Sequence, residues 1–121
     1  MREARINHTG EVIAVQDNIT CTTESVLYLI TCKKGTCGKQ YLGQTGRPLY
    51  KRYSEHEDDA MDPNTNTQVG KHFQLPGHST ADIEMIPLEK VKTGGRAVRE
   101  ARERELIRKY QLAYYGLNIQ T

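Results

Sequence analysis

Apolar positions fall in two short runs early in the chain, and their spacing predicts two paired strands. Val26–Thr31 is apolar at nearly every position, which favours a strand that is covered on both faces. Gln40–Thr45 has a strand-like pattern as well, and the segment between them, Lys33–Lys39, holds two glycines and is typical of a turn. We therefore expect an antiparallel hairpin whose first strand lies in the middle of a sheet.

Spacings of three and four residues in two later stretches predict helices. Pro48 suits the first turn of a helix that continues to about Ala60. Arg52 and His56 are four residues apart in that stretch, so they would project from one face of the helix. The strongest helical pattern covers Arg96–Tyr114 and stops at a glycine.

Two shorter elements complete the predicted order. Thr67–Gln74 favours a short helix stopped by a Pro-Gly pair, and Ile83–Leu88 alternates as a third strand. Pro87 lacks a backbone N–H, which places that strand at a sheet edge or puts the proline at the strand end. The order β-β-α-α-β-α predicts a mixed α+β domain, in which helices flank a small, largely antiparallel three-stranded sheet.

The chain length of 121 residues suffices for one domain, and 36% apolar residues predict a modest core. We interpret residues 1–25 as an N-terminal arm, with strand-like character at Glu11–Val15, and residues 26–121 as the domain. The net charge of +2 excludes a uniformly basic coat for nucleic acid but allows a local basic face. Without a membrane-length apolar run or an apolar leader, we expect an intracellular protein without membrane association.

Three cysteines and four histidines raise the question of a metal site. The odd number of cysteines, without an export signal, argues against a disulfide framework. Cys32 and Cys37 are five positions apart and His72 and His78 are six apart, and such close pairs suit zinc ligands on tight turns. The alternative is two buried thiols and two surface histidines. Cys21 is either a plain buried thiol or a competing ligand.

Tyr28 and Tyr41 lie on the two predicted strands. Tyrosine favours strands because it packs well there, so a structural role is one interpretation of both residues. The functional interpretation is that one phenol takes or relays the proton of an attacking water. The ordinary tyrosine pKa near 10 would then require help from a metal or a cation.

Charged residues on the predicted helices are further catalytic candidates. The Arg52 guanidinium would hold a phosphate as charge builds up on it, and His56 would hydrogen-bond the phosphate or relay a proton. Both residues also fit ordinary exposed positions. Glu103 or Glu100, one turn apart near an apolar stripe, would bind a divalent cation, and the pattern alone does not choose between them. Phenols, guanidinium, imidazole and carboxylate together suit phosphodiester cleavage.

These residues together resemble the GIY-YIG endonuclease family over nearly the whole predicted domain. VLYLI resembles the first signature run, with Tyr28 as its tyrosine, and YLG with the following QTG resembles the second, with Tyr41. The family's arginine and histidine, four apart on its first helix, fall on Arg52 and His56. Its metal-binding glutamate, followed by an apolar pair and a G-x-N ending, falls on Glu103.

The resemblance implies the GIY-YIG fold and a role for each of these residues. Glu103 would bind one catalytic Mg²⁺ or Mn²⁺ ion. Tyr28 is the first choice to activate the water, and Tyr41 would assist by hydrogen bonding. Arg52 would stabilise the pentavalent phosphate, and His56 would relay a proton or orient the reacting groups.

Two further residues receive lesser roles from the same resemblance. Asn118 would tie the end of the chain to the site as a structural residue. Lys51 would contact phosphate. Apart from metal ions, we expect no small-molecule cofactor.

A narrower resemblance is to the endonuclease domain of Penelope-like retroelements, because a cysteine pair separates the signature runs and KHF…GH follows later. It implies a structural Zn²⁺ ion with four ligands: Cys32, Cys37, His72 and His78. It also implies that the chain nicks DNA for target-primed reverse transcription, attached to a reverse transcriptase domain, in the nucleus.

Two other classes of function remain open. One is a non-catalytic nucleic-acid-binding zinc module derived from a GIY-YIG nuclease, which would bind nucleic acid but not cut it. The other is a purely structural zinc domain that docks a protein partner, for which no salt-sensitive DNA binding is expected.

Overall fold

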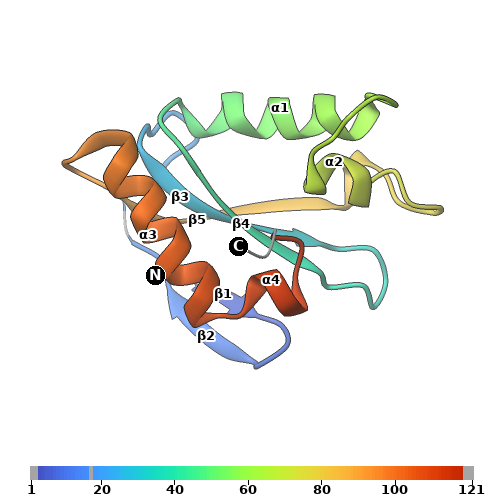
Figure 1. Ribbon diagram of the computed structural model, residues 1–121, viewed down its shortest axis with the longest axis horizontal. Helices are drawn as coiled ribbons and strands as arrows, with labels where there is room; N and C mark the ends of the chain where they lie inside the picture. Colours follow the sequence, from blue (N-terminus) through green and yellow to red (C-terminus); the bar gives the residue numbers. More distant parts are fainter. Residues whose placement is uncertain (1–2, 17, 119–121) are drawn as a thin grey trace.

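A three-stranded antiparallel sheet forms the centre of the computed structural model, which describes residues 3–16 and 18–118 (Figure 1). Strand β3 (Val26–Cys32) lies in the middle, between β4 (Gln40–Thr45) and β5 (Ile83–Lys90). Every residue of β3 is buried. This confirms the predicted hairpin, the central place of its first strand and the mixed α+β class.

Pro87 lies within the edge strand β5 rather than near its end. It pairs with Tyr28, where the register between β3 and β5 shifts by one position next to Leu27. An edge strand tolerates the missing N–H because the groups on its outer side have no strand partner. The predicted edge position is thus correct, while the strand continues two residues beyond the expected Leu88.

Each face of the sheet is covered by different elements (Figure 1). Helix α1 (Leu49–Met61) and helix α2 (Gln68–His72) pack on the face that carries Tyr28, and the short helix η1 (Thr80–Asp82) leads into β5. The opposite face packs against helix α3 (Gly95–Lys109) and helix α4 (Leu112–Tyr115).

The N-terminal residues contribute to the core, which the interpretation as an arm outside the domain did not anticipate. Strands β1 (Glu3–Ile6) and β2 (Glu11–Ala14) form an antiparallel hairpin. Ala4 and Ile6 are 2% and 0% exposed and pack in the same cluster as α3 and α4. Two inward side chains on so short a strand are too few to produce a recognisable apolar pattern.

The expected single helix over Arg96–Tyr114 is instead two helices. Helix α3 ends at Lys109, and Gln111 adopts a left-handed conformation with φ 53° before α4 begins. This turn carries Leu112 into the core, where it is fully buried. Among the helices formed by residues 3–16 and 18–118, none combines the length and apolar character that crossing a membrane requires.

Candidate active site

Tyr28, Arg52 and His56 form one hydrogen-bonded group between β3 and α1. The Tyr28 hydroxyl lies 2.7 Å from Nε2 of His56, and Nε of Arg52 donates to the same hydroxyl at 3.0 Å. Residues four apart on a helix share a face, so one phenol reaches both α1 side chains. The expectation that Arg52 and His56 project together is therefore confirmed.

The protonation state of His56 follows from its surroundings. Burial, and then the charge of Arg52, lower its pKa to about 3, so the imidazole is neutral at pH 7. Arg52 donates to the Tyr28 oxygen, and Nε2 of His56 lies within hydrogen-bonding distance of the same hydroxyl. Nδ1 is buried without a hydrogen-bond partner among the described residues.

Protonation of His56 is expected to destabilise the fold. Its pKa changes from 6.5 to about 3 on folding. Neutral His56 therefore makes its full contribution to the free energy of unfolding above pH 6.5, and this contribution is lost as the pH falls toward 3. Over pH 6 to 4 this group should lower the free energy of unfolding by up to about 1.4 kcal/mol per pH unit. Urea unfolding of the wild type and of His56→Gln measures the difference. Identical pH slopes for the two proteins would contradict the buried neutral state.

Gly43 makes room for the Tyr28 ring. The two residues are paired across β3 and β4, so their side chains would point to the same face. A Cβ atom on Gly43 would collide with the Tyr28 hydroxyl and lie 2.9 Å from Cε1 of its ring. The glycine of the YLG run is therefore a steric requirement of the phenol, a role that the sequence pattern did not reveal.

Glu103 reaches the site from the other side of the sheet edge. Helix α3 packs along the edge strand β4, and the Glu103 carboxylate accepts a hydrogen bond from the Gln44 backbone N–H. Arg99 strengthens this junction by donating from Nε to the Gln44 side chain at 2.9 Å. Among the described residues, no ion pair includes Glu103. Burial and the nearby Glu100 raise its pKa, although Arg104 and Arg52 act in the opposite direction.

A cavity of about 710 Å³ joins the two sides of the site. Its wall includes four of the five candidate catalytic residues: Tyr41, Arg52, His56 and Glu103. Tyr28 is 0% exposed and lies behind this wall. Lys51 is exposed on α1 and is not part of the wall.

The two tyrosines differ in their access to the cavity. Tyr41 is only partly buried and packs edge-to-face on His56 at 5.9 Å between ring centroids. Burial raises the pKa of both phenols, most strongly that of Tyr28, although Arg52 opposes the rise. Deprotonation of either phenol would therefore need a further positive charge close by.

Asn118 fastens the end of the described chain to β4. Its side-chain amide donates to the Leu42 carbonyl at 2.8 Å, and its carbonyl accepts from the Leu42 N–H at 2.9 Å. Both groups belong to an edge strand, whose outer N–H and C=O groups lack a strand partner. Asn118 supplies those partners and also lines the cavity.

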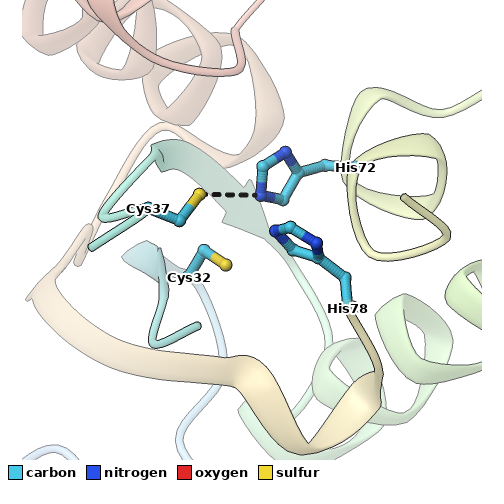
Figure 2. A group of neighbouring side chains, drawn as sticks. All are labelled: Cys32, Cys37, His72 and His78. Carbon is cyan, nitrogen blue, oxygen red and sulfur yellow. Dashed lines mark hydrogen bonds between the residues drawn. The ribbon is translucent and has the colours of Figure 1, made fainter. Parts of the chain in front are cut away.

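A second group of candidates converges at the far end of the hairpin (Figure 2). The ligand atoms of Cys32, Cys37, His72 and His78 all lie within 4.8 Å of one another. A tetrahedral zinc ion with bonds of about 2.0–2.3 Å separates its ligand atoms by about 3.3–3.8 Å. The group is therefore close to the size that zinc requires. Cys21 is exposed and is not part of it.

The protonation of these side chains fits metal binding. Nδ1 of His78 hydrogen-bonds the Pro76 carbonyl at 3.3 Å, which leaves the lone pair on Nε2, a buried atom without a partner among the described residues. Burial raises the pKa of Cys37, but the nearby His78 side chain and the Lys39 backbone outweigh it and lower the pKa. Burial raises the pKa of Cys32 to about 11, so its proton would leave only when an ion binds.

The fold and these sites define a small nuclease-type catalytic domain. The sequence matches the GIY-YIG catalytic domain family over residues 24–116, and the chain belongs to this family. It therefore is an enzyme of the GIY-YIG endonuclease class, as the signature runs predicted. The family match begins after the β1–β2 hairpin and does not include it.

A solved structure supports the same fold. The structure of the catalytic domain of homing endonuclease I-TevI superposes on this chain with a TM-score of 0.64 at 21% sequence identity. The match covers 81% of this chain and 100% of the I-TevI chain. No curated protein matches the sequence.

Proposed function

We propose that this domain is a metal-dependent DNA endonuclease that cuts one strand at a time. The observation that supports this proposal most is that one cavity is lined by an arginine, a histidine, a tyrosine and a glutamate. Such a set provides phosphate binding, proton transfer and a metal ligand within one volume. One such set of catalytic groups acts on one phosphodiester, and therefore on one strand, at a time.

Glu103 is the residue that we propose as ligand of the catalytic Mg²⁺ or Mn²⁺. Its carboxylate is partly buried and forms no ion pair among residues 3–16 and 18–118, so a cation would compensate its charge. Magnesium is commonly held by one or two carboxylates together with substrate phosphates and water, which suits a single glutamate. When bound, the ion would stabilise the developing negative charge and favour deprotonation of water.

Arg52 is proposed to bind the scissile phosphate. Although burial alone lowers its pKa, the Tyr28 phenol and Glu55 raise it above the ordinary value, so the guanidinium stays charged. Its Nε donates to Tyr28 and Nη1 to Glu55 at 3.2 Å, and these bonds fix its plane. A fixed cation stabilises the charge that builds up on the phosphate without reorganising. His56 lines the same cavity and would hydrogen-bond a phosphate oxygen or relay a proton.

The geometry favours Tyr41 over Tyr28 as the phenol that contacts the attacking water. Tyr41 lines the cavity, whereas Tyr28 is fully buried behind His56 and Arg52. The role of Tyr28 would then be to hold these two side chains in place through its hydroxyl. Tyr28 as the activating phenol stays a prediction, and exchange of each tyrosine for phenylalanine tests it.

The four-ligand group is proposed to bind structural Zn²⁺. Two thiols and two imidazoles fill a tetrahedral shell, which leaves no open position for a reacting water. The ion would link the β3–β4 turn to α2 and to the segment before η1, far apart in the chain. A cross-link of this kind holds the hairpin that carries both tyrosines.

The biological setting that we propose is a retroelement protein of the nucleus, in which nicked DNA primes reverse transcription by an attached enzyme. Support comes from the cysteine pair between the signature runs and the later histidine pair, which resemble Penelope-like endonuclease domains. The alternative, a non-catalytic zinc module, is disfavoured because the complete set of candidate catalytic residues is present.

Incubation of the purified chain with supercoiled plasmid tests the proposed activity. Open circles should accumulate with Mg²⁺ or Mn²⁺ and not with EDTA. Linear product should appear only after nicks have accumulated on both strands. DNA binding without any metal-dependent cutting would contradict the proposal and would favour the non-catalytic module.

A further inference from the structure

The cavity with the candidate catalytic residues extends beyond them, between α2 and α4. Its volume of about 710 Å³ lies within the range of about 300–1,000 Å³ typical of pockets that hold whole small molecules. The additional wall includes the amide side chains of Asn66, Gln68 and Gln111. Amides both donate and accept hydrogen bonds, as the edges of nucleobases do. The space therefore suits a nucleoside in addition to one phosphate.

Two exposed arginines border this part of the cavity. Arg104 and Arg108 lie one turn apart on α3, and neither forms an ion pair with another residue of the described chain. Arg96 and Arg102 on the same helix are both paired with glutamates. Like charges at this spacing repel each other. An anion between or beside them, such as a backbone phosphate, would remove that cost.

Tyr114 on α4 presents an aromatic ring at the same cavity. The residue lines the cavity and is 75% exposed. Its ring packs edge-to-face on Tyr115 at 4.6 Å, and Tyr115 stacks on His8 at 4.3 Å with 17° between the planes. Nε2 of His8 donates to the Tyr110 carbonyl at 2.6 Å. The β1–β2 turn thus holds the Tyr114 ring in place from behind.

A fixed, exposed aromatic ring beside unpaired cations is the arrangement that binds single-stranded nucleic acid, because every base has a π-face to stack on. We propose that Tyr114 stacks on an unpaired nucleobase next to the scissile phosphate, while Arg104 and Arg108 bind the flanking phosphates. This inference rests on the proposed DNA endonuclease function. It makes DNA with an unpaired base at the cut site the preferred substrate.

Equilibrium binding of short single-stranded DNA to Tyr114→Ala tests the proposal. The Glu103→Gln background prevents cutting, and the probe is a labelled oligonucleotide with or without an abasic site at each central position in turn. Tyr114→Ala should weaken binding to the intact strand about 5- to 150-fold, the ratio that base–aromatic stacking supplies. Tyr114→Phe keeps the ring and should bind within about twofold of the parent.

Tyr50→Ala is the matched control, because Tyr50 is an exposed tyrosine, 48% accessible, on α1 outside the cavity. It should leave binding unchanged. When the abasic site occupies one particular position, the parent protein and Tyr114→Ala should bind the strand equally well. This result assigns the Tyr114 contact to the base that is missing there. An equal loss on intact and on all abasic strands, or no loss at all, would overturn the stacking site.

The two proposals fail separately. If the wild-type chain binds single strands through Tyr114 but cuts no DNA, the stacking site holds and the endonuclease function is wrong. If it cuts plasmid and Tyr114→Ala binds like Tyr50→Ala, the endonuclease function holds and the stacking site is wrong. Thermal unfolding of each variant within about 2 °C of the parent shows that a loss of binding is not a loss of fold.

Discussion

Glu103→Gln is expected to slow plasmid nicking by about 10²–10³-fold or more, the effect of removing one group that stabilises charge in a transition state. Glutamine keeps the shape and still accepts the hydrogen bond from the Gln44 N–H, so packing of α3 on β4 should not change. The neutral amide, however, is a poor ligand for a hard divalent cation. Initial nicking rates at several Mg²⁺ concentrations measure the loss.

Glu100→Gln is the matched control for this experiment. Glu100 lies one turn before Glu103 on the same helix and forms an exposed ion pair with Arg96. Such a pair contributes about 1 kcal/mol or less, and its loss should leave nicking within a few-fold of the wild type. A large loss from Glu100→Gln together with near-normal nicking by Glu103→Gln would reverse the assignment of the metal ligand.

Continuous patterns were the part of this fold that the sequence predicted well. The uninterrupted apolar run of β3 indicates cover on both faces, and the structure buries every one of its residues. The spacing of Arg52 and His56 fixes their shared direction whatever the helix packs against. These predictions depend only on local periodicity, which tertiary contacts did not alter.

Features that depend on distant contacts were not predictable in this way. A left-handed Gln111 gives no local signal, because this conformation is uncommon for residues other than glycine, and here it precedes the fully buried Leu112. The depth of Tyr28 behind the cavity also depends on α1, which arrives later in the chain. The difference between paired Arg102 and unpaired Arg104 is set by Glu89 on β5. Such neighbours exist only in the folded protein.

The Cys/His group shows why spacing left the zinc question open. Each pair is local, but the 34 residues between Cys37 and His72 give no indication that the pairs meet. In the structure α1 and α2 return the chain so that His72 Nε2 lies 3.4 Å from the Cys37 sulfur. The whole path of the chain, rather than either motif, therefore brings the four side chains together.

Loss of the proposed zinc ion should destabilise the domain by about 4 kcal/mol, the linkage free energy when free metal exceeds its dissociation constant about 1,000-fold. For a domain of this size that corresponds to a fall in Tm of about 12–20 °C. The purified protein should contain one zinc per chain, and Cys37→Ser should lose both the metal and the stability. Metal analysis and thermal unfolding, each with and without a chelator, measure these changes.

Cys21→Ser provides the control, because Cys21 is exposed and lies outside the four-ligand group. It should retain the metal content and the Tm of the wild type. If the ion is purely structural, Cys37→Ser should lose nicking activity only through unfolding. The variant should still nick at temperatures well below its lowered Tm, because no reacting group is lost. A wild-type protein without bound zinc, or a Cys37→Ser variant that is fully folded yet inactive, would contradict a purely structural metal.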